Sequence, residues 1–89
     1  MRAVITVVGK DTVGIFAKVS TFCADHNVNI VGVSQTILED NFCMIMLVEV
    51  DEKTTVFGEF ADAIQKAGEE NGLMIHAMHE DIFNSMHKI

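Results

Sequence analysis

The order in which the hydrophobic spacing changes along the chain restricts the fold more than any other feature. Four segments have the apolar alternation or the compact apolar run of a strand, namely Val4–Val8, Asn29–Leu38, Phe42–Val50 and Leu73–His79. Two segments have helical spacing, and their apolar-face positions are Ile15, Val19, Phe22, Cys23 and His26, then Phe57, Phe60, Ile64 and Ala67. The sequence therefore predicts the order strand, helix, strand, strand, helix, strand.

This order is typical of an α+β domain with the ferredoxin-like βαββαβ plan. We expect a four-stranded antiparallel sheet with both helices on one face. Right-handed crossovers place the first and third strands at the centre of the sheet. A last short helix is predicted after the fourth strand, capped by Asp81, with the apolar stripe Ile82, Phe83, Met86 and Ile89. The 89 residues contain no proline, which indicates that residues 1–89 form a single domain.

The predicted third strand is apolar on both of its faces. Because alternate residues of a strand point to opposite sides, one face carries Phe42, Met44, Met46, Val48 and Val50, and the other carries Cys43, Ile45 and Leu47. A strand with this pattern is buried on both faces, and the two helices cover only one. The second face therefore needs the terminal helix, another subunit or both, and we expect a homodimer or a higher oligomer.

Turn and cap residues set the expected ends of the helices. The segment Asp51–Thr55 supplies Asp and Thr as N-cap candidates for the second helix, and Asn71-Gly72 is expected to end it. Gly14 lies where the chain enters the first helix, so we expect a substitution there to destabilise the protein. Gly58 and Gly68 lie within the second helix, where alanine is expected to be tolerated or to stabilise.

The formal net charge is −7, from thirteen acidic and six basic residues. An acidic surface repels phosphate backbones and anionic lipids, so we expect no nucleic-acid partner and no membrane partner. No apolar run approaches the roughly 18 residues that span a bilayer, and the first residues lack the features of a signal peptide. Cys23 and Cys43 lie in apolar runs, so we expect two unpaired thiols in a cytoplasmic protein.

The sequence shows no pattern of catalytic or metal-binding side chains. His76 and His79 are three apart in a predicted strand and face opposite sides, so they do not share a metal ion. No Cys-x-x-Cys pair is present, and Ser20 and Ser34 are isolated from any base. We therefore expect no catalytic residue, no metal and no cofactor, and a protein that is not an enzyme.

The segment Gly9–Gly14 connects the first strand to the first helix. Backbone N–H groups at a helix start are unpaired, and the helix dipole favours an anion there. A small carboxylate would suit this corner, with Asp11 placed to meet an ammonium group, and an amino acid carries both charges. The alternative is a plain turn in which the glycines serve only the change of direction. The loop is not a phosphate-binding P-loop, because no Lys-Ser/Thr pair follows the second glycine.

Three short stretches together resemble the opening of an ACT domain. They are Gly9–Ile15, then Ala17–Ser20, then Asn29-Ile30 with Gln35, and the element order extends the resemblance over nearly the whole chain. The ending Glu80–His87 is similar to that of short, free-standing bacterial ACT proteins. The resemblance implies a ligand site near the first strand–helix loop, formed by Gly9, Asp11, Thr12, Val13, Gly14 and Ile15, with Asn29 and Ile30 as the neighbouring wall.

The resemblance also implies a regulatory module, because ACT domains commonly bind amino acids and often pair their sheets across a dimer. Most ACT domains are attached to an enzyme or a DNA-binding domain, whereas residues 1–89 are expected to form one domain alone. We therefore expect this chain to sense an amino acid and to act on a separate partner protein. The alternative is a structural or interaction protein that oligomerises through its sheet without a ligand. A third hypothesis, an acylphosphatase-type enzyme, is disfavoured because that enzyme needs an arginine where this loop has only Lys10.

Overall fold

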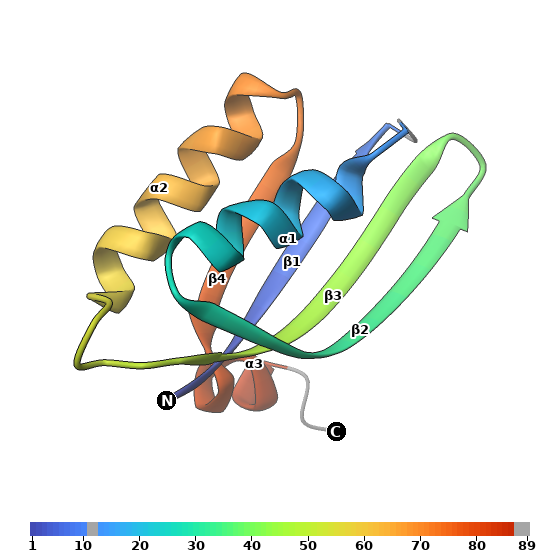
Figure 1. The fold of residues 1–89 in the computed structure, drawn as a ribbon. Coiled ribbons are helices and arrows are strands. Elements are labelled where there is room, and N and C mark those ends of the chain that lie inside the picture. Colours follow the sequence, from blue (N-terminus) through green and yellow to red (C-terminus); the bar gives the residue numbers. More distant parts are fainter. Residues whose placement is uncertain (11–12, 87–89) are drawn as a thin grey trace.

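The computed structural model describes residues 1–10 and 13–86 of the chain. Its elements are β1 (Arg2–Lys10), α1 (Ile15–Asp25), β2 (Val28–Leu38), β3 (Asn41–Val50), α2 (Phe57–Glu70), β4 (Met74–His79) and α3 (Glu80–Met86) (Figure 1). The four strands form one antiparallel sheet in the order β2-β3-β1-β4. The predicted βαββαβ plan is confirmed, with β1 and β3 at the centre, and so is the short terminal helix.

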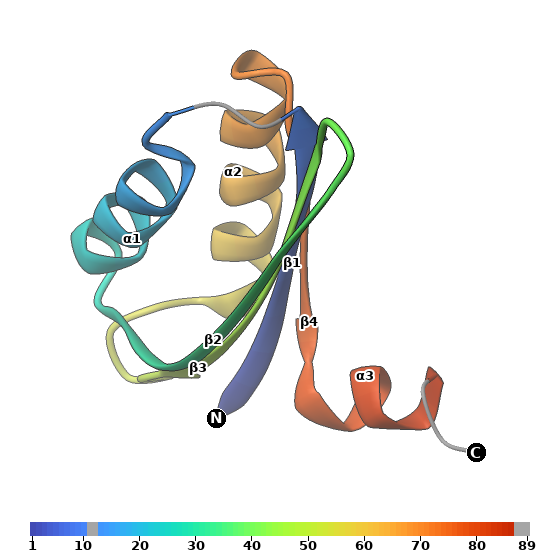
Figure 2. The ribbon, with the colours of Figure 1, turned by 90° about the vertical axis from the view of Figure 1, so that its right-hand side faces the viewer.

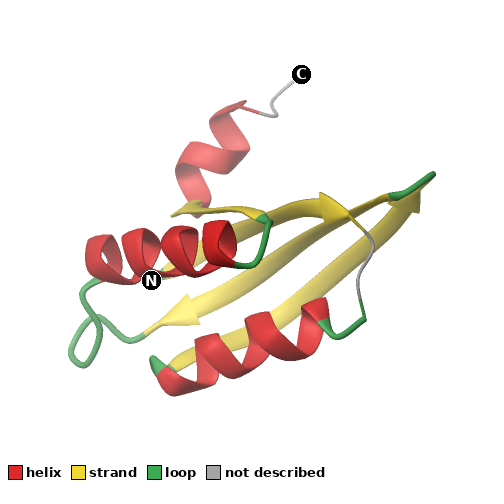
Figure 3. Cartoon of the chain, turned by 90° about the horizontal axis from the view of Figure 1, so that it is seen from above, coloured by secondary structure: helices red, strands yellow, loops and turns green. Residues whose placement is uncertain are grey.

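The two longer helices form one layer against the sheet. Figure 2 shows α1 and α2 together on one face, whereas α3 lies on the opposite side, beyond the end of β4. Seen from above, α1 and α2 lie next to each other across the strands (Figure 3). The core fills the space between this layer and the sheet, and its buried residues include Ile5, Val19, Met46, Phe60 and Ile64. Within the described part of the chain, no helix has the length and apolar composition to cross a bilayer.

The predicted two-sided pattern of β3 is confirmed. Its helix-facing side chains are buried, and they are Phe42, Met44, Met46, Val48 and Val50. On the other face, Ile45 is 45% exposed. The strand register places Val8 of β1 and Met74 of β4 on that same face, where they are 42% and 64% exposed.

The helix α3 covers one end of this second face. It contacts β1 and β4, and Arg2 Nε lies 4.0 Å from Glu80 Oε2. Val8 and Met74 lie towards the other end of the sheet and stay exposed. A single chain therefore leaves part of the second face uncovered, and the oligomer stays a prediction.

The predicted end of α2 is confirmed, because Asn71 is its C-cap and Gly72 follows with a positive φ. The predicted N-caps are corrected by the structure. The N-cap of α2 is Val56, which is extended and makes no side-chain cap bond. Asp51 and Thr55 are used elsewhere: Asp51 accepts from backbone N–H groups in the preceding turn, and the Thr55 hydroxyl donates to the His26 carbonyl at 2.7 Å. At α3 the predicted cap, Asp81, lies inside the first turn, and its own N–H donates to His79 Nδ1 at 3.1 Å.

The expectation that Gly68 accepts alanine is also contradicted. A β-carbon added at Gly68 would lie 2.6 Å from Ile75 Cγ1 and 3.1 Å from Ile75 Cβ, because α2 approaches β4 closely at this point. At Gly58, in the same helix, an added β-carbon would meet nothing within 4 Å. The difference arises from the tertiary contact between α2 and β4, which helix spacing alone does not show.

Both cysteines are free thiols, as predicted. Cys23 lies on the buried face of α1, and Cys43 lies on the second face of the sheet. Burial raises the pKa of the Cys23 thiol from 9.0 to about 11.

We expect Cys43 to react with an alkylating reagent in the folded protein, and Cys23 to react far more slowly. The thiolate is the reactive form, and the raised pKa of Cys23 lowers its thiolate fraction at neutral pH roughly a hundredfold. Timed alkylation followed by mass spectrometry measures both rates, and Cys43→Ser isolates the signal of Cys23. In urea the two cysteines should react alike. Equal rates in the native protein, or a disulfide between them, would show that the two side chains are not placed on opposite faces as described.

Candidate functional site

The predicted ligand loop lies at the corner between β1 and α1. Asp11 and Thr12 lie outside the described residues, so their roles stay predictions. Val13 is fully exposed, whereas the Ile15 side chain is only 2% exposed and belongs to the core. Ile15 can therefore offer a ligand only its backbone. Gly14, between them, has φ of 85°, a left-handed conformation that glycine adopts without strain.

Among the described residues, no side chain caps the start of α1. Gly14 is its N-cap, and its carbonyl accepts the Lys18 N–H at 3.0 Å, which begins the helical bonding. The N–H groups of the first turn lack partners within the helix, and no acidic side chain lies in that turn. Such N–H groups, together with the helix dipole, favour a single negative charge.

The two wall residues, Asn29 and Ile30, are not brought to this corner within one chain. The register aligns Asn29 with Glu49 of β3, and Glu49 with Arg2 at the start of β1. The end of β1 that leads into the corner contains Gly9, which pairs with Phe42 at the opposite end of β3. Asn29 and Ile30 therefore lie at the far end of the sheet from the loop.

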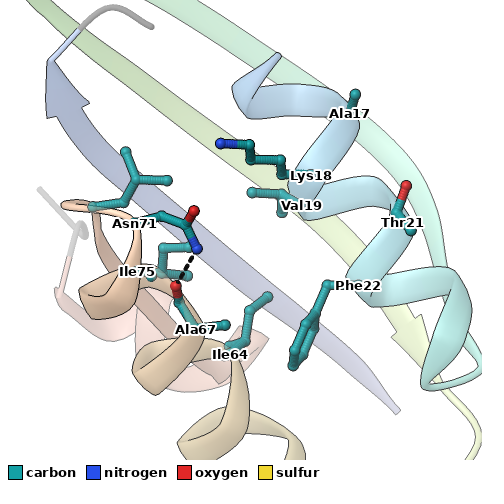
Figure 4. Close-up of a pocket in the computed structure, with 11 residues that line it drawn as sticks. Ala17, Lys18, Val19, Thr21, Phe22, Ile64, Ala67, Asn71 and Ile75 are labelled. Atoms are coloured by element: carbon teal, nitrogen blue, oxygen red, sulfur yellow. Dashed lines mark hydrogen bonds between the residues drawn. The ribbon is translucent and has the colours of Figure 1, made fainter. Parts of the chain in front are cut away.

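A groove that sequence reasoning missed lies between α1 and α2. It has a volume of about 470 Å³ and is drawn in Figure 4. Buried apolar residues form its floor, and they are Val19, Ile64, Leu73 and Ile75. Phe22 lines it from α1, while Lys18 and Asn71 supply polar groups from the two sides.

The polar groups of the groove differ in how firmly they are held. Asn71 Nδ2 donates to the Ala67 carbonyl at 2.8 Å, which fixes the amide beside the groove (Figure 4). Lys18 extends from α1 across the groove in the direction of the end of α2 (Figure 4). Within the described residues, its ammonium group makes no ion pair and no hydrogen bond.

The sequence carried only a weak signal for this groove. Lys18 and Asn71 come from opposite halves of the chain, so spacing along the sequence does not connect them. Ala17 and Ala67, which also line the groove, are small residues on helices that pack side by side. Small side chains at such positions leave space between helices, but only the structure shows that they face the same space.

Metal binding finds no support in the described part of the chain. No group of three or more His, Cys, Asp or Glu side chains lies close enough together there to hold a metal ion. The register aligns His76 with Thr6 and His79 with Ala3, which confirms that the two histidines face opposite sides.

Comparison with known proteins adds the family to this geometry. The family model of the ACT domain matches residues 2–78. The chain belongs to the ACT-domain family. A UPF0237 protein of Listeria innocua is 48% identical to this ACT domain over 89 residues and is matched over 100% of both chains. A UPF0237 protein of Methanopyrus kandleri is 46% identical over 88 residues, covering 99% of this chain and 98% of the relative.

A solved structure has the same architecture. The ACT domain protein from Streptococcus pneumoniae superposes with a TM-score of 0.82 at 38% identity, and the match covers 93% of each chain. The ACT-domain match ends at residue 78, before α3, whereas the Listeria protein aligns through that region as well. The terminal helix α3 thus lies outside the matched ACT domain, and the residues of this helix also align with the Listeria protein.

Proposed function

We propose that this ACT domain is a regulatory module, not an enzyme, that binds an amino acid at the corner between β1 and α1 and acts on a separate protein. The observation that carries the proposal is the start of α1 at Gly14, which no described side chain caps, in a chain of a family of regulatory ligand-binding domains. The first-turn N–H groups would hold the carboxylate, where the helix dipole contributes about 0.3–1 kcal/mol. Asp11 would contact the ammonium group, and the backbone of Gly9 and Val13 would approach the ligand on either side.

A second copy of the chain would complete this site. β2 is an edge strand, and its apolar residues Val31, Val33 and Ile37 are 41%, 40% and 57% exposed. Antiparallel pairing of two β2 edges would bring Asn29 and Ile30 of a second copy beside the Ile37 end of the first. That end is aligned with Gly9 through Phe42, so the predicted wall would come from the second copy.

This arrangement gives the proposal a mechanism. A ligand that contacts both copies stabilises the paired form but not the separate copies, so ligand binding and pairing are coupled. A partner protein that recognises only the paired form would then respond to the amino acid concentration. The net charge of −7 disfavours polyphosphate ligands at the same corner.

Titration calorimetry with amino acids and matched simple carboxylates, such as alanine against propanoate, tests the corner site. We expect Asp11→Ala to weaken amino acids more than carboxylates, because only the former carry an ammonium group. Asp62→Ala, an exposed change on α2, is the matched control and should have no effect. Equal affinities in Asp11→Ala and the unchanged protein would remove Asp11 from the site. Tight ATP binding would defeat the amino-acid proposal.

A second candidate function rests on the exposed apolar residues of the second sheet face. Val8, Ile45 and Met74 would be buried if two sheets packed together, and the protein would then be an assembly module without a ligand. Sedimentation at micromolar concentration, with and without amino acids, separates the two. An oligomer that none of the twenty amino acids binds or stabilises supports assembly alone, and a 9.8 kDa monomer under all conditions contradicts both candidates.

A further inference from the structure

We propose that the groove between α1 and α2 is a separate binding site for a small monocarboxylate with an apolar tail. This site shares no residue with the corner at Gly14, and the proposal does not depend on the function of that corner. It rests on three properties of the groove, namely the apolar floor, the charge at its rim and its size.

The floor of the groove suits a hydrocarbon tail. Val19, Ile64 and Ile75 are buried apolar side chains that line the groove, and Phe22 adds an aromatic face at one side (Figure 4). The hydroxyl of Thr21 and the amide of Asn71 are the uncharged polar side chains among the described lining residues. A sugar or another polyol would leave most of its polar groups unpaired against such a surface.

The charge at the rim favours an anion. Thirteen acidic residues outnumber six basic residues in the chain, yet no carboxylate is among the described residues that line the groove. Lys18 is the charged side chain there, and its ammonium group lacks a partner within the described residues. Because the rest of the protein is strongly acidic, a ligand with one negative charge fits this place better than one with several.

The size limits the ligand. Pockets for drug-sized molecules are about 300–1,000 Å³, and the groove, at about 470 Å³, lies in the lower part of that range, which favours a ligand at the small end. Lys18 is exposed to solvent, which weakens its attraction for a carboxylate. The tail must therefore supply most of the affinity, and hexanoate is expected to bind with a Kd on the order of a millimolar.

A nuclear magnetic resonance titration with butanoate, pentanoate and hexanoate tests the proposal. Saturable shifts are expected at Val19, Ile64 and Ile75, and the affinity should rise by up to about fourfold with each added methylene. Comparison of hexanol with hexanoate tests the contribution of the carboxylate, because hexanol has the same six-carbon tail without the negative charge. Shifts confined to Val13 and Gly14 would place the carboxylate at the corner and overturn the groove proposal without touching the corner site.

Two variants and a control separate tail from charge. Lys18→Met keeps the length of the side chain, and we expect it to weaken hexanoate roughly two- to fivefold while leaving hexanol unchanged. Ala67→Leu fills the groove and should abolish binding of both. Lys66→Met removes an exposed charge from α2 outside the lining and should change neither. The proposal would be overturned if both variants, Lys18→Met and Ala67→Leu, bound hexanoate as tightly as the unchanged protein does. Lys18→Met changes only an exposed side chain, so we expect this variant to fold.

Discussion

Phe60→Ala is expected to remove a large part of the stability of the fold. The Phe60 side chain is 1% exposed and joins a cluster of rings between α1 and α2. Its ring centroid lies 5.9 Å from that of Phe22, 5.8 Å from that of His26 and 6.5 Å from that of Phe57. Truncating a buried phenylalanine costs about 3–5 kcal/mol, and small domains unfold with only about 5–15 kcal/mol in total.

Urea unfolding followed by circular dichroism measures this loss. Phe60→Leu retains much of the volume and should lose less than half as much stability, and Phe57→Ala, at a half-buried position, should also lose less. All proteins must be compared at one concentration, because self-association would add to the apparent stability. A loss below about 1 kcal/mol for Phe60→Ala would mean that the ring cluster does not anchor the helices.

Gly68→Ala is the second change with a large expected effect, and its sign is opposite to that expected from helix propensity. Alanine in place of glycine within a helix gains about 1 kcal/mol when space allows. At Gly68 the new methyl group would overlap Ile75, whose Cβ and Cγ1 are too close to its backbone to move aside. Overpacking of this kind costs about 1–3 kcal/mol, so we expect a net loss.

Thermal melting of three alanine variants isolates the cause. Gly58→Ala in the same helix meets no neighbour and should melt at or above the unchanged protein. Gly14→Ala meets none of the described residues within 4 Å but must adopt a positive φ, which costs about 1–2 kcal/mol. For a domain of this size, 1 kcal/mol shifts the melting temperature by about 4–8 °C. A Gly68→Ala protein that melts no lower than Gly58→Ala would show that β4 yields to the methyl group.

The fold could be predicted because its signals are local. The two-sided pattern of Phe42–Val50 identified the strand with one face in the core and one on the opposite side, and strand order followed from the rules for crossovers. The helix N-caps could not be predicted in the same way. Asp51 and Thr55 have the right chemistry for a cap, but the preceding turn and the His26 carbonyl already use their hydrogen-bonding groups.

The candidate sites were predictable only in part. The corner after β1 follows from the position of Gly14, which the structure shows with positive φ at the helix start. The distance of Asn29 from that corner depends on the register of three strands, which spacing within one segment does not give. The groove depends on which small residues of α1 and α2 face each other, and on Asn71 lying across from Lys18.

The central position of β1 has a consequence for how the protein is made. β1 is synthesised before every other strand, yet one of its two neighbours, β4, is the last strand to leave the ribosome. The pairs from Ala3–His79 to Val8–Met74 cannot form until then, so one side of β1 stays unpaired in the nascent chain until β4 has been made. Pairing between such distant segments is slow and leaves hydrophobic strands exposed. The sheet is therefore completed only after β4 has emerged, and the nascent chain is most open to aggregation or chaperone binding in the interval before that.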